Sequence, residues 1–140
     1  MKRIKQFLKS KKGDGYIDVV VAVLVSMMLI VIALNVFQFF VLKQDIDYFA
    51  KELIETATAN GSTMGEVNHR YYELCDETGI YPGYSFSESD YMSGSYYKVQ
   101  LGDTITVKLT YTTYVKGVGV FKIPVTLTAS YSGLSKYYWK

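Results

Sequence analysis

Few residues of this 140-residue chain have the types and spacing that catalysis or metal binding requires. His69 is the single histidine; Glu66 and Glu73 are nearby, but no cysteine lies at metal-ligand spacing. We therefore expect His69 to be a solvated helix residue. An envelope enzyme would need a deep pocket that joins His69 to acids of a sheet. No Ser, His and Asp arrangement can be argued, so the sequence predicts no enzyme, cofactor, metal or small-molecule substrate.

Cys75 is the single cysteine, so the chain cannot close an internal disulfide. Two interpretations remain for it, a buried thiol or half of an intermolecular bridge. The fourteen tyrosines are the other group of side chains that invites a functional interpretation. They suit either a subunit contact or adhesive face, or ordinary half-buried positions in the sheet and loops. The aromatic residues at the C-terminus are alternatively a packed end of the sheet.

Asp18 is chemically notable because it lies at the entrance of a long apolar run. Residues 19–42 read VVVAVLVSMMLIVIALNVFQFFVL and contain no charge. A helix rises about 1.5 Å per residue, so this run is roughly 36 Å long and crosses a hydrocarbon layer of about 30 Å. We expect residues 14–42 to form a transmembrane helix, with Asp14 and Asp18 at the positive end of its dipole.

Two amide side chains, Asn35 and Gln38, interrupt this apolar run near its outer end. They are three residues apart and so share one helical face. They form hydrogen bonds between helices, or they lie at the water interface.

The charge distribution predicts the orientation of this helix. Six of the fifteen Lys and Arg residues lie in residues 1–13, which contain no acid, and the rest of the chain is net negative. Short basic flanks stay in the cytoplasm, so we expect a cytoplasmic N-terminus and an extracytoplasmic C-terminal domain. Residues 1–13 are the only basic cluster, and nothing after them resembles a nucleic-acid-binding patch.

Beyond the apolar run, residues 43–60 continue the helix as an amphipathic extension. No Pro or Gly interrupts residues 16–60, and Asn60-Gly61 is a suitable end. A second, short helix follows, with Thr63 and Glu66 at capping-box spacing and Gly79 as its stop. The extension has apolar residues at helical spacing, which predicts a buried face: Ile46, Phe49, Ala50, Leu53, Ile54 and Ala57.

The remaining chain, within residues 61–140, predicts a small sheet covered on one face by a helix. Residues 80–95 show no period and are expected to be a loop. Gly102-Asp103 suits a hairpin turn, and Pro124 argues that the last strand lies at an edge. Three runs alternate apolar and polar residues, as antiparallel strands with one buried face do: 96–101, 104–115 and 121–131. The fold class is therefore α+β: one long helix, one short helix and a three-stranded antiparallel meander.

The stretch Lys12-Gly13-Asp14-Gly15-Tyr16-Ile17-Asp18 resembles the leader junction of type IV pilins and their Tad-type relatives. The later plan is similar to TadE-like minor pilins, down to the Gly102-Asp103-Thr104 entry of a strand. This resemblance implies that prepilin peptidase cuts after Gly13 and leaves Asp14 as the first residue. It also implies that Asp18, at the fifth mature position, pairs with an N-terminal amine of another subunit.

The match departs from the family at two points. Asp18 replaces the more common Glu and is followed by Val19, where the family often has an aromatic residue. Gly15 offers a second cut site, although Asp18 at the fifth position favours Gly13. The resemblance implies a minor pilin or pseudopilin of a type-IV-pilus-like apparatus, whose partners are the membrane, other pilin-like subunits and the peptidase. Each claim has an alternative. For Asp18, the alternative is that it is only an interfacial helix-start residue. For the chain, the alternative is an uncleaved signal-anchored envelope protein whose outer domain binds partners in a secretion or conjugation system.

Overall fold

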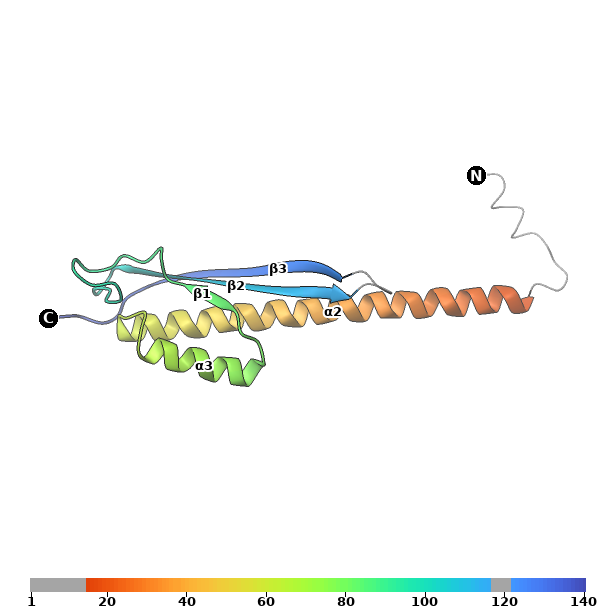
Figure 1. Ribbon diagram of the computed structural model, residues 1–140, viewed down its shortest axis with the longest axis horizontal. Coiled ribbons are helices and arrows are strands. Elements are labelled where there is room, and N and C mark those ends of the chain that lie inside the picture. Colours follow the sequence, from red (N-terminus) through yellow and green to blue (C-terminus); the bar gives the residue numbers. More distant parts are fainter. Residues whose placement is uncertain (1–14, 117–121) are drawn as a thin grey trace, which may run out of the picture. The chain divides into compact units, whose positions relative to one another are not determined.

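The computed structural model describes residues 15–116 and 122–140 of the chain. The elements, in order, are α2 (Gly15–Asn60), α3 (Glu66–Thr78), β1 (Gly83–Ser85), β2 (Thr104–Lys116) and β3 (Lys122–Leu134), drawn in Figure 1. They divide between two compact units, of which the first ends at Gln38 and the second is Phe39–Lys140. This order of elements confirms the predicted α+β class. The leader with Gly13 and Asp14 lies outside the described residues.

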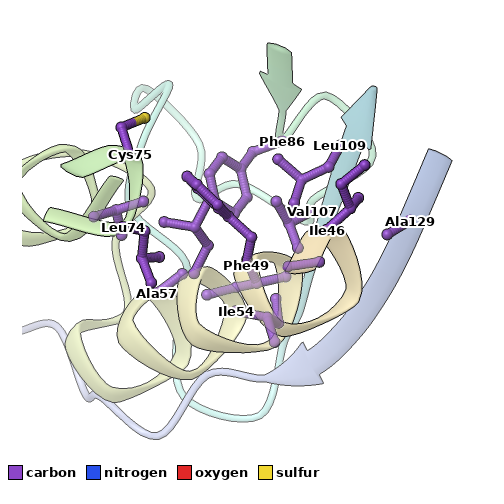
Figure 2. Packing of buried hydrophobic residues seen from close by; sticks show 14 of the residues in the cluster. Ile46, Phe49, Ile54, Ala57, Leu74, Cys75, Phe86, Val107, Leu109 and Ala129 are labelled. Carbon is purple, nitrogen blue, oxygen red and sulfur yellow. The ribbon is translucent and has the colours of Figure 1, made fainter. Parts of the chain in front are cut away.

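Helix α2 is continuous over 46 residues, as the absence of helix breakers predicts. It ends where Gly61 adopts a φ of 57°, a left-handed conformation that glycine reaches without strain. In the unit 39–140, its apolar stripe forms the centre of the core, and Figure 2 shows Phe49 there among residues of the sheet and α3. Ile46, Phe49 and Leu53 are fully buried, which confirms the predicted amphipathic face.

Helix α3 packs beside the C-terminal half of α2 and buries Val67, Leu74 and Cys75. Its stop at Gly79 is confirmed by a φ of 70° and a hydrogen bond from the Gly79 N–H to the Cys75 carbonyl. The predicted capping box is wrong: the N-cap is Gly65, and no side chain caps the helix. The physical reason is that Thr63 is buried and its hydroxyl lies 3.4 Å from the hydroxyl of Tyr91.

The sheet has the order β1-β2-β3 and is antiparallel throughout. The predicted first strand at 96–101 is wrong, because β1 is formed by Gly83–Ser85, inside the segment 80–95 that was expected to be a loop. Residues 96–101 form backbone hydrogen bonds with the end of α2 instead: the Val99 N–H donates to the Gly61 carbonyl. Among the described residues, their only strand-like contact is one bridge between Lys98 and Ser62.

Strands β2 and β3 form a long ladder, in continuous register from Thr104↔Leu134 to Lys116↔Lys122. Their helix-facing side buries an alternating set, as the sequence pattern predicts: Ile105, Val107, Leu109, Leu127 and Ala129. Ile123 shares this parity but is 60% exposed, so the predicted apolar face of β3 stops short of its first residues. Pro124 lies on an edge strand, as predicted.

Candidate functional site

The first part of α2 exposes its apolar side chains along its whole length. From Tyr16 to Phe37, every large apolar side chain is 44–88% exposed, whereas Phe49 and Leu53 in the same helix are fully buried. The helix is long and apolar enough to cross a membrane. Such exposure in water would be strongly unfavourable, at roughly 25 cal/mol for each Å². This segment, hereafter the stem (residues 15–38), is therefore compatible with a single-pass membrane anchor.

The predicted polar residues of the stem do not form one site. Asp18 is exposed in the first turn of α2. Asn35 and Gln38 lie about 100° and 160° away from it around the helix axis, at about 100° per residue. The Asn35 amide donates to the Val31 carbonyl of its own helix over 2.9 Å, which occupies one of its two N–H groups. Gln38 is exposed. The stem thus has an acid on one face and two amides on another.

Arg70 joins α3 to α2 through a group of carboxylates that the sequence analysis missed. Its guanidinium lies 3.0 Å from Glu52 on α2, and 3.1 Å and 3.2 Å from Glu73 and Glu77 on its own helix. The hydrogen bond to Glu52 is the main cause that raises the pKa of Arg70 above its ordinary value. The spacing from Arg70 to Glu73 could have signalled one pair, but Glu52 is brought in only by the packing of two helices. His69, predicted to be solvated, is largely exposed and lies 3.3 Å from Glu73.

An aromatic cluster lies between α2, α3 and β1. The rings of Tyr71 and Tyr84 are 4.7 Å apart, and Phe49 meets Tyr71 edge to face at 5.5 Å. The Tyr71 hydroxyl donates to the Pro82 carbonyl over 3.0 Å. Burial raises the pKa of Tyr71 to about 12 and also raises the pKa of the free, buried Cys75 thiol. These groups stay neutral at ordinary pH and serve packing.

The C-terminal aromatic residues form a packed end next to the last turn of α2. The Trp139 indole N–H donates to the Gly61 carbonyl over 3.0 Å. The Gln100 amide exchanges two hydrogen bonds with the Trp139 backbone, and the Lys98 ammonium lies 4.2 Å from the Trp139 ring centroid. The rings of Tyr137 and Trp139 are in tilted contact, with centroids 4.7 Å apart, but Tyr137 remains 45% exposed. Tertiary contacts thus explain part of this cluster and leave Tyr137 partly open to solvent.

Within residues 15–116 and 122–140, no group of three His, Cys, Asp or Glu side chains comes together in a way that could hold a metal ion. The arrangements above are those of a packed domain and an apolar stem. Asp18 and the stem are therefore the residues on which a functional argument can be built.

Comparison with known proteins gives one family and no named relative. No curated protein and no solved structure matches the chain. A family model described as "Domain of unknown function (DUF4320)" matches residues 23–140, which include most of the stem and the whole second unit. The chain therefore belongs to the family described as Domain of unknown function (DUF4320).

Proposed function

We propose that the chain is a structural subunit, a minor pilin or pseudopilin, of a Tad-type, type-IV-pilus-like assembly or secretion apparatus. The subunit is inserted in the cell membrane before assembly, with a cytoplasmic N-terminus and an extracytoplasmic C-terminal domain. The observation that carries the proposal is the change along α2 in the exposure of its apolar side chains. The apolar face of its second half is buried by its own domain, while the stem covers none of its large apolar side chains.

An exposed stem of this kind needs lipid or other stems around it. Lipid satisfies the apolar surface but not the carboxylate of Asp18, whose burial at the bilayer centre costs about 2.5–3.5 kcal/mol and less near the edge. An amine of a neighbouring subunit would offset that cost and set the axial offset between two stems. This supports bundling over a solitary anchor.

The distribution of small residues along the stem supports the same conclusion. Asp18, Ala22, Ser26 and Ala33 lie within an arc of about 80° around the helix, at about 100° per residue. Leu29 and Val36 share this arc. Small side chains let helix backbones approach closely in a membrane. The Ser26 hydroxyl donates to the Ala22 carbonyl over 2.8 Å, so this face carries no unpaired hydroxyl proton into the contact. We assign this face to stem–stem packing.

N-terminal mass spectrometry of the protein from its native host tests the proposal. We expect loss of residues 1–13, with Asp14 as the first residue and therefore Asp18 as the fifth. A chain beginning at Tyr16 would move the cut to Gly15 and remove the fifth-position role of Asp18. An intact N-terminus in the membrane fraction would replace the pilin proposal with the uncleaved anchor, and mature protein in the cytosol would contradict both.

A further inference from the structure

Strand β3 has one paired edge and one open edge. In the sheet order β1-β2-β3 it pairs only with β2, over its full length of 13 residues. Lys43 lies on α2, and its ammonium donates a 2.9 Å hydrogen bond to the Thr128 carbonyl. This carbonyl therefore points away from β2. In an antiparallel ladder, the N–H and C=O of one residue point to the same side. Thr128 therefore turns both groups to the open edge.

The contacts of β2 give the same register independently. Thr110, the partner of Thr128, pairs with Gly83 of β1 on the other side. The Thr106 N–H donates to the Ser89 hydroxyl, and the Thr104 carbonyl accepts from the Asp90 N–H, also away from β3. Even-numbered residues of the two strands are thus the non-hydrogen-bonded pairs. By the unbroken register, the open edge presents the backbone N–H groups of the even-numbered residues of β3 other than Pro124. The four that lie between Pro124 and Leu134 belong to Thr126, Thr128, Ser130 and Ser132.

This edge has the properties of a strand-binding site and few of the usual protections. The four residues are exposed, and no charged residue occurs between Lys122 and the end of β3. Pro124 also has even parity, so its missing N–H costs the β2 ladder nothing. In the described part of the chain, no hydrogen bond is found from the four edge N–H groups to another residue. Apart from Pro124 and the ammonium of Lys43, this long edge carries, between Lys122 and Leu134, no group that opposes strand pairing, and such edges are templates for pairing with another chain.

Lys43 determines which strand fits. Its ammonium lies on the edge, bonded to the Thr128 carbonyl and, over 2.7 Å, to Asp47. A docking strand supplies a backbone N–H to that carbonyl and frees one of the three ammonium N–H groups, while Asp47 keeps another. The freed N–H needs a new acceptor. A carboxylate on the docking strand provides it, whereas a second copy of β3 contains no acid and brings its own Lys43 to the same edge.

We propose that the open edge of β3 binds an extended, acidic segment of a partner protein as a fourth strand, with a carboxylate near Thr128 that takes over the ammonium of Lys43. The backbone hydrogen bonds supply the binding, and Lys43 selects for negative charge. Binding here is independent of the stem, so it goes beyond the structural role proposed above.

The test uses full-length protein in detergent micelles and a synthetic peptide of alternating Thr and Val with one central Asp. Alternate residues of the peptide carry N-methyl groups, so that it pairs through one edge only. We expect saturable binding that slows amide hydrogen exchange at Thr126 and Ser130 by about tenfold and leaves Leu127 unchanged. The same peptide with Lys in place of Asp should bind about fivefold more weakly.

Protein variants separate the backbone from the side chain. Ser130→Pro removes one edge N–H, at a position of the same parity as Pro124, and should abolish the slowing; Ser130→Ala keeps the N–H and should bind normally. If the Ser130→Pro variant does not fold, the hydrogen exchange of wild-type protein with the Asp and Lys peptides still tests the proposal. The proposal is overturned if Thr126 and Ser130 exchange at the same rate with and without peptide, if the Asp and Lys peptides bind equally, or if the edge is protected by self-association alone.

Discussion

Gly133 of β3 lies so close to Thr58 of α2 that a Cβ on the glycine would come 2.9 Å from the Thr58 methyl carbon. Gly133 does not adopt a left-handed conformation, so it is required for space and not for φ. Helix and strand approach each other this closely just where the Lys136 N–H donates to the Thr58 carbonyl over 2.8 Å. The close approach of Gly133 to Thr58 and the hydrogen bond from Lys136 together hold the end of β3 against the end of α2.

Gly133→Ala should therefore destabilise the unit of residues 39–140 by about 1–3 kcal/mol, the usual cost of overpacking a fitted contact. Urea unfolding in micelles, followed by the fluorescence of Trp139, measures it, because Trp139 is the single tryptophan and lies at this end of the domain. Thr58→Ser removes the clashing methyl and keeps the hydroxyl that bonds the Glu55 carbonyl. The double variant should recover most of the loss; additive effects would show that the strain lies elsewhere.

Arg70→Ala should cost about 1–2 kcal/mol, because it removes three charge-assisted hydrogen bonds, one of which joins two helices. A double-mutant cycle with Glu52→Gln isolates the bond between helices. His69→Ala is the matched control on the same helix, since its side chain is 73% exposed, and it should change stability by less than about 0.5 kcal/mol. A coupling energy of zero between Arg70 and Glu52 would make the contact incidental.

The domain should lose stability at high pH, because the partly buried hydroxyl of Tyr71 resists ionisation. Its pKa is raised to about 12 in the folded chain by burial, and is about 10 in the unfolded chain. The folded state then holds a proton that the unfolded state has lost, so stability is full below pH 10 and falls as pH rises from 10 to 12. Tyr71→Phe should lower stability by about 1 kcal/mol at pH 7, through the lost bond to Pro82.

The same substitution should make the alkaline fall shallower without removing it, because burial also raises the pKa of Tyr84. Urea midpoints measured at pH 8, 10 and 11 in micelles give both effects. An unchanged slope in Tyr71→Phe would assign the alkaline loss to other groups. The near-ultraviolet spectrum of phenolate formation provides a second reading of the same titration.

Asp18→Ala tests the role proposed for the stem. Membrane insertion and leader removal should be nearly intact, because neither needs the pairing, while assembly should be lost. Asp18→Glu is the conservative control and should assemble, since it keeps the charge. Cell fractionation and recovery of assembled material separate these steps. Normal assembly of the alanine variant would leave Asp18 as an interfacial helix-start residue.

The helical half of the fold could be predicted from residue spacing. The recurrence of Ile46, Phe49 and Leu53 marks one face of a helix, and the charge-free stretch before them marks the stem. The two long strands were equally readable, because alternate residues of β2 must face a core or solvent. The spacing of apolar residues is enough to predict these helices and long strands, since it depends only on the geometry of each element.

The sequence by itself thus determined the two helices and the two long strands, the continuity of α2, and an acid at the start of an apolar stem. It predicted the wrong short segment as the partner of β2, because residues 96–101 alternate as a strand does, whereas residues 80–95, which contain β1, show no period. The packing of Tyr84 on Tyr71, and the bond from Val99 to Gly61, decided which segment pairs with β2. The contact of Arg70 with Glu52 and the open edge at Lys43 likewise belong to tertiary structure alone, since backbone hydrogen-bond direction and contacts between distant segments leave no period in the sequence.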